Sequence, residues 1–481
     1  RERISSLLTG AGPVREVGKP RLPVDRAFSL KGVGTVVTGT LTDGEIEVGK
    51  DYEIQPSGES VHVRTAQSHG SSADIVPPGT RTALNLSGIA LRESRGAAKE
   101  GIGRGDVLVP VEMGEAVYVI DVLISKSNRE IRGMKQSKKA LRTGREIMFH
   151  HGSMGLPARI HFLGQRSLSP GETVLAELRF SDPVFVFVGD GFVIRDASLG
   201  LTLAGGIILD ENANRRAFRK PFQATFLETR SEDPHDLARL VRSQLVRDRV
   251  AFLPDLLVRS VFSEGDIRTE AGRLVEAGEL EQNGDWVFLA EWWRKIRSMA
   301  GDQVKEIHRK HPEQLGYPLR ELRALMEPEL PSPKFFDMVL EGLLAGEFAK
   351  AGPNIRHRDH VPQLPPELKS SGELVRQRLA SDLISPPNKG ETATNSNEEK
   401  ALRFMVHTGE VVDLDAKTVI SNDGFENIRQ QICDFLSEHG RATASDLRQH
   451  TGTVRRILMP LLERLDELGV TKREGDERRL K

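Results

Sequence analysis

The sequence predicts a mixed, multidomain protein in which two antiparallel β-barrels precede a tandem array of small helical modules. Three observations predict this class. At 481 residues, the chain is too long for a single hydrophobic core. Up to about residue 210, short β-branched segments alternate with Gly turns, as in small barrels. Beyond residue 211 the apolar period moves from two toward 3.6, and Leu, Arg and Glu replace Val and Gly.

The first barrel is expected over residues 21–112. It opens with two strands on either side of the turn Lys31-Gly32-Val33-Gly34. That turn is no phosphate loop, because the pattern G-x-x-x-x-G-K-[ST] is absent from the whole chain. We therefore expect no NTPase core. Residues 1–20 are expected to be a linker or the remnant of a preceding domain.

The second barrel is expected over residues 113–212. Its most unusual part is residues 126–166, which carry ten Lys or Arg and only two acids, a local charge of about +8. Phosphate contact is the physical use of such a patch. A solvated loop face is an equally good interpretation of the composition alone.

Four modules follow, at residues 213–290, 291–363, 364–421 and 422–481. Three of them show the order helix, short helix, helix, two-stranded hairpin, which is the winged-helix plan. The third copy is degenerate, and its polar stretch at 385–399 has the composition of a mobile loop. A period of about 60 to 70 residues favours a linear array.

Composition excludes several classes of protein. The net charge is −1, so any nucleic-acid contact must come from local basic patches. Cys433 is the one cysteine, so neither a disulfide framework nor a thiolate metal site is expected. The neighbours His150 and His151 point to opposite faces of a strand, so we interpret them as structural or RNA-facing. No membrane partner and no metal are expected, and we expect a cytoplasmic monomer.

Several motifs resemble one family. PVDRAFSLKGVGTVVTGTLTDGEIEVG is similar to the start of the second domain of translational GTPases, and within them to the selenocysteine-specific elongation factors (SelB family). PPGTRTALNLSGI, HHGSMGLPARIHFLG and LTLAGGIILD agree with that family's two barrels. The winged-helix array separates the family from ordinary tRNA-carrying factors. The resemblance implies a GTP-binding domain before Arg21, which this chain lacks.

The resemblance implies a pocket for the selenocysteinyl group, and the matching positions are Arg26 and Arg81. A selenol is anionic at neutral pH, and two guanidiniums favour an anion over a neutral seryl group. On residue chemistry alone, Arg26 merely pairs with Asp25 or caps a barrel rim. The same resemblance implies that the basic segment binds the acceptor and T arms of the aminoacyl-tRNA. The residues assigned to that contact are Lys135, Lys138, Lys139, Arg142 and Arg145.

In the family, the terminal module binds a hairpin in the message. Here that module has eleven basic and eleven acidic residues, so only position identifies an RNA-binding face. The start of its third helix and its wing are the parts of such a module that meet nucleic acid. The residues assigned to hairpin binding are Thr453, Arg455, Arg456, Lys472, Arg473, Gly475, Arg478 and Arg479. The alternative is a generic protein-binding winged helix.

The expected function is delivery of selenocysteinyl-tRNA to the ribosome at UGA codons, with the message hairpin held by the C-terminal module. The alternatives are a DNA-binding regulator with tandem winged helices and a general aminoacyl-tRNA-binding translation factor. GTP and Mg²⁺ are expected for a complete family member. We find no residues for either in this chain, and so expect no enzyme activity from it alone.

Overall fold

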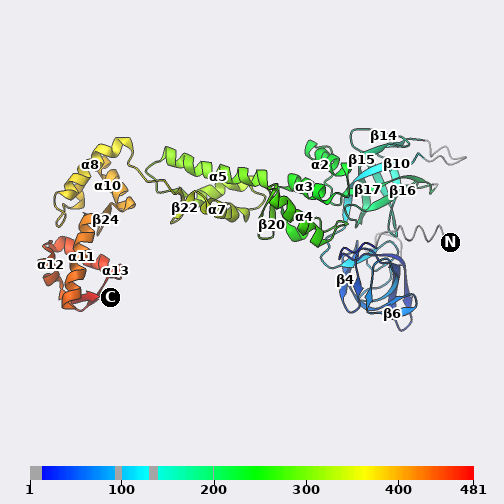
Figure 1. The fold of residues 1–481 in the computed structure, drawn as a ribbon, viewed down its shortest axis with the longest axis horizontal. Helices are drawn as coiled ribbons and strands as arrows, with labels where there is room; N and C mark the ends of the chain where they lie inside the picture. Colours follow the sequence, from blue (N-terminus) through cyan, green and yellow to red (C-terminus); the bar gives the residue numbers. More distant parts are fainter. Residues whose placement is uncertain (1–13, 93–99, 129–138, 199) are drawn as a thin grey trace. The chain divides into compact units, whose positions relative to one another are not determined.

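The computed structural model describes residues 14–92, 100–128, 139–198 and 200–481 (Figure 1). The chain divides into two compact units, Arg1–Trp293 and Arg294–Lys481. The first unit holds two β-barrels and one winged helix, and the second holds further helical modules (Figure 1). The predicted mixed, multidomain class is confirmed.

The first barrel is a six-stranded closed sheet in the order β4-β9-β1-β2-β8-β5, since β4 also pairs with β5. Its strands are β1 (Leu22–Leu30), β2 (Gly34–Thr40), β4 (Asp51–Gln55), β5 (Glu59–Ser68), β8 (Arg81–Ser87) and β9 (Val107–Pro110), with β6 (Ser71–Ala73) added beside β5 and the pair β3 (Ile46–Glu47) and β7 (Ile75–Val76) alongside. Alternate residues face inward. Val24, Val37 and Leu84 are fully buried. The predicted glycine turn is confirmed, because Gly32 and Gly34 have positive φ angles of 83° and 102°.

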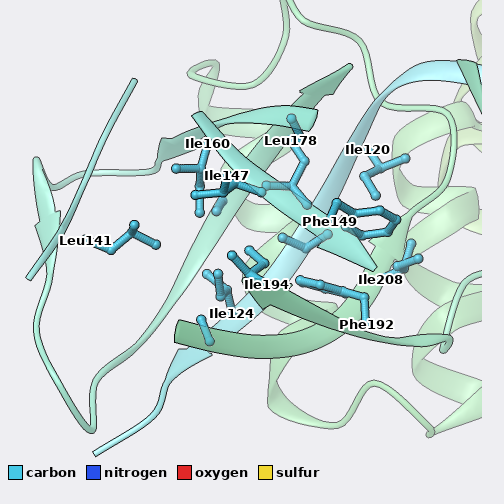
Figure 2. Packing of buried hydrophobic residues seen from close by; sticks show 14 of the residues in the cluster. Ile120, Ile124, Leu141, Ile147, Phe149, Ile160, Leu178, Phe192, Ile194 and Ile208 are labelled. Atoms are coloured by element: carbon cyan, nitrogen blue, oxygen red, sulfur yellow. The ribbon is translucent and has the colours of Figure 1, made fainter. Parts of the chain in front are cut away.

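The second barrel closes in the order β10-β15-β13-β12-β16-β17. Its strands are β10 (Val117–Lys126), β12 (Glu146–His151), β13 (Met154–Phe162), β15 (Thr173–Val184), β16 (Gly191–Arg195) and β17 (Thr202–Asp210), with the pair β11 (Leu141–Arg142) and β14 (Ser167–Leu168) beside them. Branched aliphatic residues and phenylalanines fill it (Figure 2). The Phe149 and Phe180 rings meet edge to face at 5.1 Å.

The first winged helix packs against the second barrel. Its elements are α2 (Pro221–Glu232), α3 (Leu237–Asp248), β18 (Val250–Phe252), the 3₁₀ turn η2 (Leu253–Asp255), α4 (Glu264–Glu276), β19 (Leu280–Asn283) and β20 (Trp286–Leu289). The winged-helix order predicts a short helix between α3 and α4, and that expectation is wrong for this module, since only the 3₁₀ turn η2 forms there. The following backbone pairs with the barrel instead, through Val188 N to the Arg259 carbonyl at 2.8 Å and Val261 N to the Val188 carbonyl at 3.1 Å.

The second winged helix has the predicted order of elements. These are α5 (Ala290–Lys310), β21 (Tyr317–Pro318), α6 (Leu319–Met326), the 3₁₀ turn η3 (Glu327–Glu329), α7 (Phe335–Ala345), β22 (Phe348–Ala351) and β23 (Asn354–His357). Its wing is the antiparallel pair β22–β23, which β21 extends to three strands.

The third module contains the turn η4 (Pro366–Leu368), α8 (Lys369–Ala380), α9 (Lys389–Thr392), α10 (Ser396–Thr408), β24 (Val411–Asp413) and β25 (Val419–Ser421). The stretch 385–399, expected as one mobile loop, holds α9 and the start of α10. Two asparagine caps account for the difference. Asn388 forms a capping box with Glu391, and the Asn395 side chain accepts from the amides of Asn397 and Glu398.

The last module contains α11 (Asn422–His439), β26 (Ala442–Thr443), α12 (Ala444–Thr451), α13 (Arg455–Glu467), β27 (Thr471–Glu474) and β28 (Glu477–Leu480). Its apolar core is built around α11 and α13. Val412 and Leu414 of the third module pack against the same core. The last two modules are therefore joined by a shared apolar contact.

Candidate functional site

The two arginines expected to line a selenocysteinyl pocket, Arg26 and Arg81, lie on the outer face of the first barrel. Strand register places Arg26 opposite Thr38 and Arg81 opposite Thr40, so both arginines share that face with β2. Both side chains are exposed. The ladder is irregular between Val24 and Arg26, where Asp25 is the extra residue of a bulge.

Asp25 is held by Arg81 and Thr38. Arg81 Nη1 donates to Asp25 Oδ2 at 2.5 Å, and Thr38 Oγ1 donates to Oδ1 at 2.7 Å. The hydrogen bond from Arg81 is the largest cause that lowers the pKa of the Asp25 carboxyl, and Arg26 contributes less. The carboxylate therefore fixes the Arg81 guanidinium, which stays 55% exposed at the side chain. The sequence interpretation had considered Asp25 only as a partner of Arg26.

The basic segment of the second barrel is described in part. Lys135 and Lys138 lie outside the described residues. Lys139 is exposed, and Arg142 is an exposed residue of β11. Arg145 donates from Nη2 to Asp196 Oδ2 at 2.7 Å, and the Asp196 side chain is only 2% exposed. A buried carboxylate thus orients Arg145, whose side chain is still 39% exposed.

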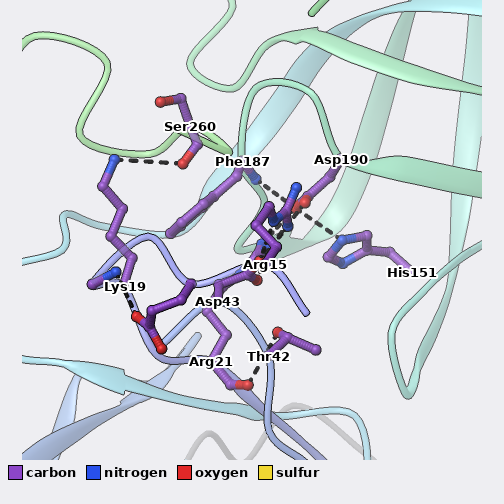
Figure 3. Close-up of polar contacts among 11 residues, drawn as sticks. Arg15, Lys19, Arg21, Thr42, Asp43, His151, Phe187, Asp190 and Ser260 are labelled. Carbon is purple, nitrogen blue, oxygen red and sulfur yellow. Dashed lines mark hydrogen bonds and ion pairs between the residues drawn. The ribbon is translucent and has the colours of Figure 1, made fainter. Parts of the chain in front are cut away.

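Sequence reasoning missed a buried joint between the two barrels, formed by Arg21, Asp43, His151 and Asp190 (Figure 3). Arg21 donates to Asp190 Oδ2 at 2.6 Å from Nη1 and to Oδ1 at 2.9 Å from Nη2. Its Nε and Nη2 also lie 2.8 and 2.6 Å from Asp43 Oδ2. His151 Nε2 lies 3.0 Å from Asp190 Oδ2, which gives this histidine a structural role.

Electrostatics hold this inter-barrel joint in its charged form. Burial alone would raise the pKa of the Asp190 carboxyl, but Arg21 and His151 outweigh it and hold that pKa well below its usual range. The Arg21 guanidinium also stacks 4.0 Å from the centre of the Phe187 ring. The two joined carboxylates come from positions 22 and 169 residues away from Arg21. No local sequence signal could have paired them.

Part of the stretch expected as a linker is packed against this joint. Lys19 is 6% exposed, and its Nζ donates to the carbonyls of Leu257 and Ser260 at 3.3 and 3.4 Å (Figure 3). Burial, followed by the nearby Arg21, lowers the pKa of Lys19 to about 8. Residues before β1 therefore contact the first winged helix directly.

The residues assigned to hairpin binding fall into two groups. Exposed ones are Arg455, Arg456, Lys472, Arg473, Gly475 and Arg479. Thr453 is 3% exposed and Arg478 is 3% exposed, with Arg478 Nε donating to Asp466 Oδ2 at 3.0 Å. Arg456 donates from Nη2 to the Pro386 carbonyl at 2.7 Å. The basic wing and the start of α13 are thus exposed, whereas Thr453 and Arg478 are buried. Arg456 is exposed and also contacts the third module.

Comparisons with known proteins match both halves of the chain. A family described as "Elongation factor SelB, winged helix" matches residues 434–480, and "Selenocysteine-specific elongation factor, beta-barrel domain" matches residues 128–215. The selenocysteine-specific elongation factor of Desulfomicrobium baculatum is 26% identical over 488 aligned residues, which cover 99% of this chain and 74% of that protein. The chain belongs to the SelB family.

Further SelB relatives agree with this assignment. The selenocysteine-specific elongation factor of Escherichia coli K12 is 27% identical over 471 aligned residues, covering 96% of this chain and 70% of that protein. The crystal structure of a bacterial selenocysteine-specific elongation factor, EF-Sec, aligns with a TM-score of 0.58 and 18% identity, covering 100% of this chain and 72% of that one. At that identity the structural match supports the fold alone.

No phosphate-loop pattern occurs in the sequence. Within residues 14–92, 100–128, 139–198 and 200–481, no group of three or more His, Cys, Asp or Glu side chains could hold a metal ion. In the same part of the chain, no helix has the length and apolar character needed to cross a bilayer.

Proposed function

We propose that this SelB chain holds selenocysteinyl-tRNA on its two barrels and binds a message hairpin through its last winged helix, so that selenocysteine is delivered to the ribosome at UGA codons. The observation that carries the proposal is the outer face of the first barrel. There the exposed side chains of Arg26 and Arg81 share one face, and Asp25 fixes the Arg81 guanidinium. The family assignment supplies the ligand class.

Charge supplies the discrimination in this proposal. A selenolate is an anion that guanidinium groups bind by charge-assisted hydrogen bonds, whereas a seryl hydroxyl is neutral and gains less. Arg81 is already fixed by Asp25, so little side-chain entropy is lost when it meets an anion. A neutral seryl group would gain no charge-assisted hydrogen bond from these arginines, which disfavours the wrong ligand.

The second barrel is proposed to hold the tRNA arms. Lys139 and Arg142 offer exposed cations, and Asp196 orients Arg145. Lys135 and Lys138 belong to the same proposal from sequence alone. Phosphate contacts of this kind position an RNA without reading its sequence, and they weaken as salt rises.

The last winged helix is proposed to bind the hairpin through Arg455 and the wing residues Lys472, Arg473 and Arg479, with Gly475 in the wing turn. Gly475 has a positive φ of 68°, which lets the wing reverse tightly. Tethering the factor to the message raises its effective concentration beside the ribosome. Translation factors related to this chain are GTPases that use GTP and Mg²⁺. We place its work in the cytoplasm, where translation occurs.

Competition between selenocysteinyl-tRNA and seryl-tRNA for the chain tests the pocket. We expect Arg81→Ala to lower the preference for selenocysteinyl-tRNA by about tenfold or more, since one charge-assisted hydrogen bond contributes about 1.5–3 kcal/mol. Arg26→Ala should act in the same direction. Arg64→Ala is the matched control, because Arg64 is an exposed residue of β5 in the same barrel. An unchanged preference in Arg81→Ala would refute the pocket.

Binding of a UGA-proximal RNA stem–loop, compared with duplex DNA of equal length, tests the tether. Arg455→Ala and Arg473→Ala should each weaken hairpin binding, and each lost phosphate contact should reduce the salt slope by about one. Arg464→Ala is the control, since Arg464 lies at the other end of α13 and pairs with Glu467 at 3.0 Å. Preference for duplex DNA would favour a DNA-binding regulator instead.

A further inference from the structure

A short strap of the third module, Asp382–Pro386, lies against the start of α13 in the last module. It follows α8 and precedes α9. The strap is locally rigid. Asp382 Oδ1 accepts from the amides of Ile384 at 3.0 Å and Ser385 at 2.8 Å, and two consecutive prolines end it.

Three contacts fasten the strap to the last winged helix. Thr453 Oγ1 donates to the Ile384 carbonyl at 2.6 Å, and Arg456 Nη2 donates to the Pro386 carbonyl at 2.7 Å. Close packing of Gly424 supplies the third contact, since a Cβ there would lie 2.6 Å from the Leu383 carbonyl oxygen. Any side chain at residue 424 would push the strap away. The strap is thus built into the module that we propose to bind RNA.

The strap changes what the start of α13 offers to a ligand. The Thr453 hydroxyl and Nη2 of Arg456 donate to strap carbonyls, while Arg455 and Arg456 are both exposed. Leu383 precedes Ile384 in the sequence, and Val454 follows Thr453, so each end of the Thr453–Ile384 hydrogen bond has an apolar neighbour. The two apolar residues are 42% and 41% exposed. Exposed apolar side chains next to the start of α13 suit the face of an unpaired base better than a phosphate.

We propose that the strap is part of the RNA-binding surface: Leu383 contacts an unpaired loop base of the hairpin, and Thr453 and Arg456 are positioning residues that hold the strap in place. The proposal rests on the hairpin binding proposed above. It makes the third module a determinant of hairpin specificity, whereas the sequence assigned that role to the last module alone.

The direct test measures binding of the full chain to a UGA-proximal RNA stem–loop and to the same stem–loop with each unpaired loop nucleotide made abasic in turn. We expect Leu383→Ala to weaken binding of the intact hairpin by about fivefold to tenfold. It should have no effect on the hairpin that lacks the contacted base. Leu374→Ala is the matched control, because Leu374 lies on α8 of the same module and is 45% exposed.

Variants of Thr453 test the positioning role. Thr453→Val removes the hydrogen bond to the strap and should reduce discrimination between the intact and abasic hairpins. Thr453→Ser keeps the hydroxyl and should restore discrimination. A general loss of folding in Thr453→Val would instead weaken binding of the intact and abasic hairpins alike. The Leu383→Ala result does not depend on that folding.

The outcomes separate this inference from the proposed function. If the wild-type chain binds the hairpin and Leu383→Ala binds the intact and abasic forms as the wild type does, the strap is not part of the surface and the tether still stands. If Leu383→Ala weakens all hairpins equally, the base contact is refuted. If the wild-type chain binds the stem–loop no better than a plain RNA duplex, hairpin binding itself fails.

Discussion

Two arginines of the first barrel, Arg21 and Arg81, each contact aspartate at hydrogen-bond distance and differ in what surrounds them. Arg21 has a side chain that is 8% exposed, and it meets Asp43 and Asp190, which are 2% and 6% exposed. Arg81 is 55% exposed and meets Asp25, which is 30% exposed. Both distances are hydrogen-bond distances, so geometry alone does not separate the two pairs.

Burial decides what each pair does. Removing one member of a buried pair leaves an uncompensated charge inside the protein, so such a pair stabilises the fold and neither member is available to a ligand. An exposed pair gains little from its own attraction, because water and salt screen it. Arg81 can therefore exchange part of its interaction for a ligand, whereas Arg21 cannot. Arg81, whose partner leaves it half in water, is therefore the arginine that we propose to bind a ligand.

Arg21→Ala is expected to produce the largest effect. It leaves Asp43 and Asp190 buried without their guanidinium, so the free energy of unfolding of the barrels should fall by about 3–5 kcal/mol. All three Trp of the chain lie at 286–293, so their fluorescence does not report on the barrels. Hydrogen exchange of the β1 and β16 amides measures the loss. Arg64→Ala should leave exchange unchanged, and a loss below about 1 kcal/mol in Arg21→Ala would contradict the joint.

Asp121→Asn changes a buried carboxylate that, unlike Asp190, has no guanidinium as its hydrogen-bond partner. Asp121 is fully buried and accepts from Gln223 Nε2 at 2.9 Å, while its neighbour Asp210 pairs with Arg247 at 2.6 Å. Burial, followed by Asp210, raises the pKa of Asp121 to about 8. The folded chain therefore holds a proton that the unfolded chain releases near pH 4.

The sign of the pH dependence follows from that raised pKa. The stability that comes from protonated Asp121 is fully present below about pH 4 and is lost as pH rises toward 8. Asn keeps the neutral form at every pH, so Asp121→Asn should raise the free energy of unfolding at pH 8 by about 1–3 kcal/mol. Asp190→Asn should instead destabilise at neutral pH, because Asp190 is stabilised in its charged form. Equal pH profiles for wild type and Asp121→Asn would refute this assignment.

The fold was largely predictable because it depends on local patterns. The change of apolar period near residue 211 marks the change from barrels to helices, and Gly32 and Gly34 mark the first hairpin turn. One failure was local in origin and the other came from a contact with the barrel. The caps Asn388 and Asn395 were present in the sequence but were interpreted as loop residues. The segment after Leu253 was expected to be a helix, and its contact with the barrel decides otherwise.

The candidate sites were less predictable because they depend on contacts between distant segments. Arg26 and Arg81 came from a family resemblance, and their assignment to the pocket stays a prediction. Asp25 was visible beside Arg26, yet its hydrogen bond to Arg81 spans 56 positions. Thr453 was assigned to RNA from its place at a helix start, but its hydroxyl bonds a carbonyl 69 positions away. The apolar periodicity of a sequence does not predict contacts between residues so far apart.

Arg81→Ala should have the smallest effect on stability. It tests whether the exposed Arg81–Asp25 pair contributes less to the fold than the buried pairs of Arg21. Without RNA, the free energy of unfolding should change by less than about 1 kcal/mol, because exposed ion pairs contribute little. Even this difference should vanish in 1 M salt, where the Debye length falls to about 3 Å. Hydrogen exchange of the β1 and β8 amides at low and high salt measures it. A loss as large as that of Arg21→Ala would show that Arg81 is structural. The lowered tRNA preference of that variant would then no longer identify a pocket, because a damaged barrel would produce it too.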